Sequence, residues 1–288
     1  MTEHNRNIQD DDFRVIGKTI KEKANKKRVI IIVTFVLFFF AVVFTLVFWL
    51  RSKPHEQIGG LFDDNTSWQS VGSLLPLGHS AQISYTEEID TIINDIHLSL
   101  LIPHNATPAL VVGTPSVSDT TIILAMQAAD IRADNQKILG SFVYKGDVIA
   151  QGKSKKGYCA IIDNNIIIGA AESTSLFEEA ADKGGYFFRQ YPLVDNGILV
   201  ESGPKGKSLR RALCRRIGEV FVALSETDES MHDFAQALVD LGVENAIYLV
   251  GGQYAYGWFV DKENTLTELG HDTIQYQNEN YIVWNKLK

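Results

Sequence analysis

Residues 231–252 read MHDFAQALVDLGVENAIYLVGG, and this stretch combines the two kinds of element that decide the fold. Its apolar residues first recur at helical spacing, after Ser230, a residue type that favours the N-cap position. Gly242 stands where such a helix ends. The apolar run 246–250 follows at once and stops at two glycines, as a strand does. We therefore predict a helix that leads through a tight turn into a strand.

Strand signals dominate the domain that contains this stretch. Short β-branched runs are separated by Gly, Asn and Asp at close intervals. In CAIIDNNIIIGA, Asp163, Asn164 and Asn165 predict a hairpin turn because they tolerate left-handed conformations. The predicted strands are His97–Ile102, Ala109–Val112, Thr121–Leu124, Ile138–Tyr144, Tyr158–Ile162, Ile166–Ala170, Gly185–Phe188, Val220–Ser225, Ala246–Val250 and Tyr281–Trp284.

A second helix is predicted after Ser175. Glu178 follows three residues later in a capping-box pattern, and Gly184-Gly185 ends the segment. Predicted strands outnumber helices, and their spacing is irregular. We therefore expect an α+β fold with a twisted, largely antiparallel or mixed sheet and flanking helices.

The N-terminal region contains an apolar run long enough to cross a bilayer. Residues Val29 to Leu50 carry no charge over 22 positions. A helix of that length, at about 1.5 Å per residue, spans a hydrocarbon core of about 30 Å. Lys and Arg are denser before the run than after it, which places the N-terminus in the cytoplasm. A cleaved signal peptide is the alternative, although its apolar region is usually about half as long.

This apolar run divides the chain into four predicted segments. We predict a cytoplasmic tail at 1–28, one transmembrane helix at 29–50, a juxtamembrane linker at 51–74 and an extracytoplasmic domain at 75–288. From Arg51 onward the chain carries 19 basic and 30 acidic residues. Such an acidic domain is a poor candidate for binding nucleic acid or anionic lipid over a broad face. The lipid bilayer is therefore expected as a partner only through the transmembrane helix.

The chain has two cysteines, Cys159 and Cys214, and both fall in the predicted extracytoplasmic domain. An oxidising compartment permits them to form a disulfide, and two buried free thiols are the alternative. No Cys-x-x-Cys pair and no metal-type Cys/His spacing occurs, so we expect no zinc site. The sequence indicates no metal and no cofactor.

The segment GPKGKSLRRALCRRIGE, residues 203–219, concentrates six Lys and Arg residues within 12 positions. Arginine forks bind phosphate oxygens in a bidentate manner, so this segment is the natural place for a phosphate-bearing ligand. A solvated basic loop that pairs with the surrounding carboxylates is the alternative. The letters Gly206-Lys207-Ser208 do not form a P-loop, because the earlier glycine of that motif falls on Glu201.

A second polar cluster, AADIRADNQ, occupies residues 128–136. Asp130 and Asp134 flank Arg132, and carboxylates beside an arginine are able to serve as acid, base or ligand of a sugar hydroxyl. Asp130 and Asp134 are therefore candidate catalytic residues, and Arg132 is a candidate ligand-binding residue. A plain surface loop of alternating charge is the alternative.

Three stretches in order give the region from about Ile122 to Lys288 a resemblance to the phosphodiester glycosidase family. QYPLVDNGILVESG, residues 190–203, is similar to a family segment in which a turn precedes an arginine-bearing strand. RRALCRRIGEVFVALSE, residues 210–226, is similar to an Arg-x-Ala segment followed by an apolar strand. The opening stretch resembles the family's succession of helix, Leu-Gly turn, Asn-Ala and strand ending in Gly-Gly.

The resemblance implies an enzyme that removes a sugar from a sugar-1-phosphodiester and leaves a phosphorylated acceptor. It implies that Arg210 or Arg211 meets the phosphodiester, and that Gly251 and Gly252 let backbone amides approach the ligand closely. It also implies a bacterial envelope protein, with the domain in the periplasm or on the cell-surface side of the inner membrane and a link to exopolysaccharides.

The chain departs from the family pattern at several positions. Val250 stands where the family has an Asp before Gly-Gly, Gln253 and Tyr254 replace a glycine and a serine, and residues 130–134 replace an Asn-Gly-Gly-Phe-Phe segment. Activity is therefore open, and Asp130 and Asp134 would have to take over the chemistry.

Three hypotheses follow from these patterns. The first is a membrane-anchored phosphodiester-glycosidase-like protein that hydrolyses or recognises sugar-1-phosphodiesters or phosphorylated envelope glycans. The second is a catalytically inactive glycan-binding or scaffolding domain that retains the fold. The third is a purely structural envelope component, suggested by Tyr254, Tyr256 and Trp258, which we expect to be exposed.

Overall fold

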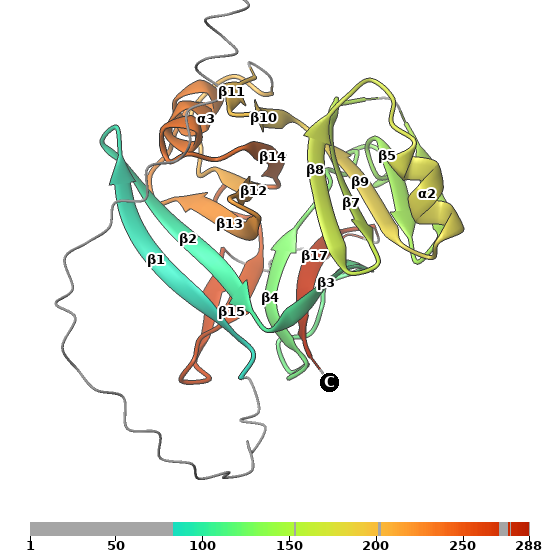
Figure 1. The fold of residues 1–288 in the computed structure, drawn as a ribbon, viewed down its shortest axis with the longest axis horizontal. Helices are drawn as coiled ribbons and strands as arrows, with labels where there is room; N and C mark the ends of the chain where they lie inside the picture. Colours follow the sequence, from blue (N-terminus) through green and yellow to red (C-terminus); the bar gives the residue numbers. More distant parts are fainter. Residues whose placement is uncertain (1–82, 153, 201–202, 271–275, 277, 288) are drawn as a thin grey trace, which may run out of the picture. The chain divides into compact units, whose positions relative to one another are not determined.

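The strands that the structure describes form three antiparallel sheets (Figure 1). The computed structural model describes residues 83–152, 154–200, 203–270, 276 and 278–287. The first sheet has seven strands in the order β1-β2-β13-β12-β14-β10-β11. Its strands are β1 (Tyr85–Ile93), β2 (Ile96–His104), β10 (Pro192–Asp195), β11 (Ile198–Leu199), β12 (Arg211–Arg216), β13 (Glu219–Ser225) and β14 (Asn245–Leu249).

The other two sheets have five strands each. The second has the order β16-β15-β4-β17-β3 and the third the order β6-β5-β9-β7-β8. The second sheet consists of β3 (Ala106–Val112), β4 (Ile122–Gln127), β15 (Gly257–Val260), β16 (Leu266–Leu269) and β17 (Asn280–Lys286). The third consists of β5 (Ser141–Tyr144), β6 (Asp147–Gln151), β7 (Gly157–Ile162), β8 (Asn165–Ala170) and β9 (Tyr186–Gln190).

All three sheets contribute to one hydrophobic core. Its buried side chains include Leu213 and Ile247 of the first sheet, Met126 and Ile282 of the second, and Phe142 and Phe188 of the third. Because side chains alternate along a strand, each sheet has a second face. Helix α3 (Met231–Asp240) packs on the second face of the first sheet, and helix α2 (Leu176–Asp182) packs on that of the third.

The predicted α+β class is confirmed in outline, and all ten predicted strands fall on observed strands. The strands are distributed over three sheets, however, and several were not predicted. The clearest omission is β12, because its sequence, RALCRR, was interpreted as part of a basic loop. Its alternate residues Ala212 and Cys214 are nevertheless fully buried against the α3 side.

Local capping signals were only partly reliable. The Ser230 hydroxyl accepts a hydrogen bond from the Asp233 amide at 3.0 Å, as the N-cap prediction requires. The Ser175 side chain makes no such bond, so the predicted capping box at α2 is wrong. There the Thr174 hydroxyl accepts a bond from the Leu176 amide at 3.3 Å instead.

The hairpin predicted in CAIIDNNIIIGA is confirmed. Residues Ile162 and Asn165 face each other across the β7–β8 pair. Between them Asp163 and Asn164 have φ values of 51° and 64°. Two consecutive left-handed residues are typical of the tight turn that matches the twist of a hairpin.

Cys159 and Cys214 are buried free thiols. Cys159 on β7 lies in the core shared by the sheets, whereas Cys214 on β12 points to the α3 side of the first sheet. Because that sheet separates the two side chains, they do not form the disulfide that the sequence left open.

Burial raises the pKa of both thiols well above its ordinary value. We therefore expect neither cysteine to react with iodoacetamide at pH 8 in the folded protein, because the thiolate is the nucleophile. Mass spectrometry should show two alkylated cysteines once the protein is unfolded. Alkylation of the folded protein would contradict this burial, and failure to alkylate the unfolded, unreduced chain would indicate a disulfide.

Among residues 83–287 that the structure describes, neither helix is long and apolar enough to span a bilayer. The predicted tail, transmembrane helix and linker, residues 1–74, lie outside the described residues. The assignments of these three segments stay predictions.

Candidate functional site

A cavity of about 290 Å³ lies where the first two sheets meet. Its lining comes from residues 127 and 129–131 at and after the end of β4, residues 250–251 and 254–255 after β14, and residues 276 and 279–280 before and at the start of β17. We call it the β4–β14 pocket. Its size is at the lower end of the range of about 300–1,000 Å³ typical of small-molecule sites.

Hydrogen bonds between the sheets hold the pocket wall together. The Val250 amide donates to the Gln127 carbonyl at 3.2 Å and so joins the end of β14 to the end of β4. The Asn280 side chain accepts from the Ala129 amide at 2.7 Å and donates to the Ala129 carbonyl at 3.1 Å. Asn280 is 1% exposed, so this pair of bonds fixes the segment that carries Asp130.

Asp130 is the candidate catalytic residue from the sequence that the structure places in this pocket. Its side chain is 29% exposed. Lys155 donates to one carboxylate oxygen, and Gln190 donates to the other at 3.1 Å. Asp130 is thus a partly exposed carboxylate whose two oxygens both accept hydrogen bonds from the protein.

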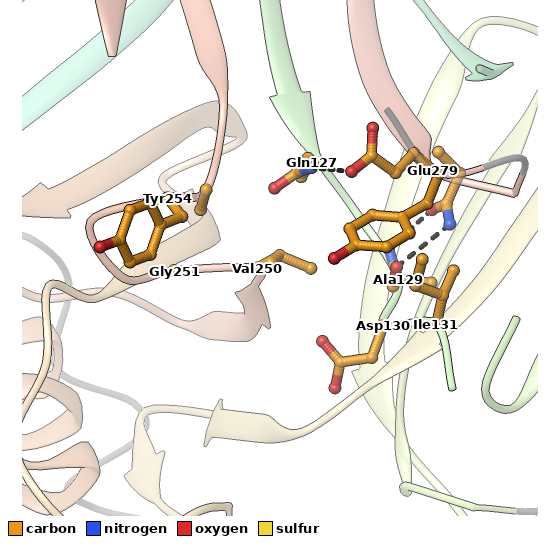
Figure 2. A pocket seen from close by; sticks show the side chains of 11 residues that line it. Gln127, Ala129, Asp130, Ile131, Val250, Gly251, Tyr254 and Glu279 are labelled. Carbon is orange, nitrogen blue, oxygen red and sulfur yellow. Dashed lines mark hydrogen bonds between the residues drawn. The ribbon is translucent and has the colours of Figure 1, made fainter. Parts of the chain in front are cut away.

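Glu279 is a second carboxylate in the pocket, and sequence reasoning missed it. Its side-chain oxygens accept bonds from Gln127 at 3.2 Å and from the Thr114 hydroxyl at 3.1 Å. Figure 2 shows Asp130 and Glu279 reaching the cavity from different segments, with Gly251 and Tyr254 on another side. No motif surrounds Glu279, and only its position just before a strongly apolar strand could have drawn attention to it.

Gly251 lines the pocket, but its amide and that of Gly252 are used within the protein. The Gly251 amide donates to the Tyr248 hydroxyl at 3.1 Å, and the Gly252 amide donates to the Leu209 carbonyl at 2.9 Å. A Cβ atom on Gly251 would lie 2.5 Å from the Leu209 oxygen. Glycine is required here by close packing of the chain, and the geometry does not favour the predicted role of these amides in ligand binding.

Arg210 and Arg211 point to opposite faces of the first sheet, because successive strand residues alternate. The Arg210 guanidinium donates to the Glu229 carbonyl at 2.7 Å and to the Gly206 carbonyl at 2.5 Å. Arg210 is 3% exposed and does not line the β4–β14 pocket. Its guanidinium is directed at these two carbonyls and is not presented to the pocket, where the resemblance implies that it meets a phosphodiester.

Arg211 is buried on the core side, with its guanidinium 3.9 Å from the Met126 sulfur. Burial lowers its pKa to about 10, and the nearby Tyr248 and Tyr281 hydroxyls oppose this shift. Arg211 does not line the pocket either. The two arginines therefore do not form one phosphate clamp, and their predicted role is not supported by their positions.

The other arginines of segment 203–219 also bind backbone carbonyls. Arg215 donates to the Ile166 carbonyl, and Arg216 donates to the Leu241 carbonyl at 3.4 Å. The sequence offered two roles for this segment, a phosphate site and pairing with carboxylates. Neither role matches these bonds to backbone carbonyls. A buried or half-buried guanidinium supplies several donors, so it is well suited to satisfy backbone carbonyls.

Arg132 and Asp134 lie outside the pocket and pair with each other. The Arg132 Nε atom is 3.0 Å from an Asp134 oxygen, and the two side chains are 52% and 61% exposed. This is the plain surface loop that the sequence left as the alternative. The predicted catalytic role of Asp134 and the predicted ligand-binding role of Arg132 find no support in this position.

The aromatic residues after Gly252 divide into two kinds. Tyr254 lines the pocket and is 74% exposed. Tyr256 and Trp258, which we expected to be exposed, are 5% and 0% exposed and pack with Tyr281 on the outer face of the second sheet. Among the described residues, no group of three or more His, Cys, Asp or Glu is arranged to hold a metal ion.

Comparisons with known proteins support a related fold. No protein-family model matches the sequence, and no curated protein sequence does. The catalytic domain of zebrafish N-acetylglucosamine-1-phosphodiester alpha-N-acetylglucosaminidase, auto-inhibited by its pro-peptide, matches with a TM-score of 0.51 and 11% identity, over 72% of this chain and 84% of that chain.

A hypothetical protein from Synechocystis matches with a TM-score of 0.51 and 13% identity, over 70% of this chain and 62% of that chain. The match thus spans less than two thirds of the Synechocystis protein. At such identities the likeness concerns the fold alone, and the resemblance to the phosphodiester glycosidase family holds at that level. The chemistry of the pocket depends on the residues of this chain.

Proposed function

We propose that the β4–β14 pocket binds a glycan and that the domain acts as a phosphodiester-glycosidase-like hydrolase. The observation that supports this proposal is the presence of two carboxylates, Asp130 and Glu279, and an exposed aromatic side chain, Tyr254, around one cavity. Carboxylates accept hydrogen bonds from sugar hydroxyls and catalyse glycoside cleavage, and tyrosine offers a flat apolar face with a polar tip. The related fold of the zebrafish glycosidase domain agrees with this reading.

Among glycoside substrates, a sugar-1-phosphodiester requires the fewest catalytic groups from these residues. Its hydrolysis joins a water oxygen to the anomeric carbon, while the bond from that carbon to the phosphate oxygen breaks. The electron pair of that bond leaves with the phosphate monoester, which is stable as an anion. The site then mainly needs a base that takes the proton of the attacking water, and Asp130 is the carboxylate placed to do this.

We also propose the cellular setting that the sequence predicts. The run Val29–Leu50 would anchor the chain in a membrane, with the basic flank in the cytoplasm and the domain outside it. Phosphorylated glycans of a bacterial envelope or exopolysaccharide would then be within reach of the pocket. Protease protection of the two termini in sealed vesicles tests this orientation.

The decisive experiment is a turnover assay on the purified full-length protein in detergent. Methyl phosphodiesters of glucose 1-phosphate, galactose 1-phosphate and N-acetylglucosamine 1-phosphate serve as substrates, and the matching methyl glycosides without phosphate serve as controls. We expect release of free sugar and methyl phosphate from at least one phosphodiester. A folded protein that releases no sugar from any of them contradicts the enzymatic proposal.

A non-catalytic glycan-binding domain is the second candidate. One observation favours it: Val250 stands where the family resemblance places a carboxylate. In that case calorimetry with the same phosphodiesters should show saturable binding without any product. Absence of both binding and product would contradict both candidates.

Tyr254 provides a test of the glycan itself. The Tyr254→Ala variant should bind sugar ligands about 5- to 10-fold more weakly, because it loses an aromatic contact worth about 1 kcal/mol. Tyr276 also lines the pocket and is left unchanged in this variant. The control is Tyr144→Ala, because Tyr144 packs on Tyr186 away from the pocket. Equal affinity of Tyr254→Ala and the unaltered protein, measured by calorimetry, would exclude Tyr254 from the sugar contact.

A further inference from the structure

We propose that Lys155 is the positioning residue of the β4–β14 pocket and holds the Asp130 carboxylate in place. The catalytic role of Lys155 rests on the proposed function. The contact between Lys155 and Asp130 does not rest on it and is testable without a substrate. Lys155 lies outside every segment that sequence reasoning singled out.

The contacts of Asp130 on its protein side come from two residues. The Lys155 ammonium donates to Oδ2 of Asp130, and the Gln190 amide donates to Oδ1 at 3.1 Å. Lys155 also donates to the Gln190 side-chain oxygen at 2.9 Å. The three polar groups thus form a closed cycle in which each contacts the other two. Such a cycle leaves the carboxylate little freedom to turn away from the cavity.

Lys155 is buried to a degree that is unusual for lysine. Its side chain is 5% exposed, and its ammonium lies 4.5 Å from the centre of the Tyr191 ring. Burial lowers the pKa of Lys155, and the neighbouring Asp130 charge opposes that shift. A buried ammonium is stable only with a partner of opposite charge. The buried Lys155 ammonium therefore requires the Asp130 carboxylate as its partner.

The backbone around Lys155 is held by a buried arginine. Arg189 is 5% exposed, and its Nη1 atom donates to the carbonyls of Lys155 at 3.2 Å, Lys156 at 3.3 Å and Ala171 at 2.7 Å. Lys155 itself has a φ of 70°, a left-handed conformation that a lysine rarely adopts. The surrounding bonds stabilise this conformation, which delivers the ammonium to the back of the pocket.

The direction of these bonds assigns a chemical role to Asp130. Both of its oxygens accept N–H donors from the protein, one of them charged. Asp130 also lines the cavity with a side chain that is 29% exposed, so a water or a sugar hydroxyl in the cavity is able to donate to it. This arrangement suits the role of proton acceptor that the proposed function gives to Asp130.

The contact is tested by a double-mutant cycle on the full-length protein in detergent, with thermal unfolding as the readout. Lys155→Met should lower the Tm by roughly 5–15 °C, because it leaves the Asp130 charge without its partner. The double variant Lys155→Met/Asp130→Asn should recover at least about half of that loss. Additive losses in the double variant would overturn the proposal.

The matched control is the neighbouring Lys156. Its side chain is 65% exposed and pairs with the exposed Glu172, so Lys156→Met should change the Tm by less than about 2 °C. A similar loss in both lysine variants would show that the loop as a whole is sensitive and would overturn the specific role of Lys155.

The catalytic meaning is tested separately, with the methyl phosphodiester that the unaltered protein hydrolyses. Lys155→Met should lower kcat by at least about 10-fold and change KM by less than about 3-fold, since a misplaced base affects the reaction more than binding. A change in KM alone would overturn the positioning role in catalysis. If the unaltered protein hydrolyses nothing, the proposed function fails, while recovery in the double variant still supports the contact.

Discussion

The Asp130→Asn variant is expected to lose at least about 100-fold in kcat/KM on the hydrolysed sugar-1-phosphodiester, because a general base typically contributes that much or more. The amide keeps the size of the side chain but does not take a proton. It also leaves the Lys155 ammonium without its counterion, so the Tm should fall by several degrees while the protein remains folded. The measurement is initial-rate kinetics beside thermal unfolding of the same preparation.

Asp134→Asn is the matched control for this prediction. Asp134 lies in the same loop but is exposed and pairs only with Arg132 among the described partners. Its variant should retain kcat/KM within about 2-fold and unfold as the unaltered protein does. Equal losses in the two variants would remove Asp130 from its proposed place in the chemistry. A full loss in Asp134→Asn alone would favour the role that the sequence suggested for it.

The Arg210→Ala variant is expected to lose about 3–5 kcal/mol in the free energy of unfolding. Its guanidinium bonds two carbonyls, those of Gly206 and Glu229, and each bond to a charged group contributes about 1.5–3 kcal/mol. Truncation leaves both carbonyls without this donor and opens a space at the end of β12. Urea unfolding of the full-length protein in detergent, followed by tryptophan fluorescence, measures the change.

Lys207→Ala is the control in the same segment. Lys207 is 66% exposed and approaches Glu229 at 3.8 Å, so its loss should change the free energy of unfolding by less than about 0.5 kcal/mol. An Arg210→Ala variant that keeps its stability but loses phosphodiester turnover would restore the ligand-binding role implied by the family resemblance. The two readings of Arg210 therefore predict opposite combinations of stability and activity.

The parts of the fold that were predictable depend on short-range physics. The Ser230 cap and the Asp163-Asn164 turn are stabilised by bonds and backbone conformations of residues close in sequence, so the residue types alone indicate them. The ten apolar runs became strands because their β-branched residues suit a half-buried surface. The arrangement of these strands in three sheets depends on pairings between distant segments, for which one sequence carries no local signal.

The candidate site likewise combines a residue that the local sequence indicates with residues that only the fold brings to it. Asp130 was recognised because it lies in a polar cluster, but the same cluster led to Asp134 and Arg132, which face solvent. Glu279 and Lys155 stand far from Asp130 in the sequence. The fold brings Lys155 into contact with Asp130 and places Glu279 in the lining of the same cavity. No pattern of neighbouring residues could have connected them.

The basic segment was misread for a related reason. Charge composition predicts a phosphate site only where the charged groups are free to meet a ligand, and burial decides whether they are. Arg210, Arg215 and Arg216 donate to backbone carbonyls, and Arg211 lies in the core. Whether a guanidinium meets a ligand or a carbonyl depends on which atoms the fold brings to it.

The residues by themselves determined the predicted class of the domain, the helix after Ser230 and the strand that ends at Gly251-Gly252, since these follow from spacing, capping and turn chemistry. They also carry the apolar run Val29–Leu50 and its prediction of a membrane anchor. Tertiary structure alone decided which charged groups share a cavity, that the two thiols lie on opposite sides of a sheet, and that Gly251 packs against Leu209. The physical reason is that burial and pairing of polar groups depend on contacts between segments far apart in the chain.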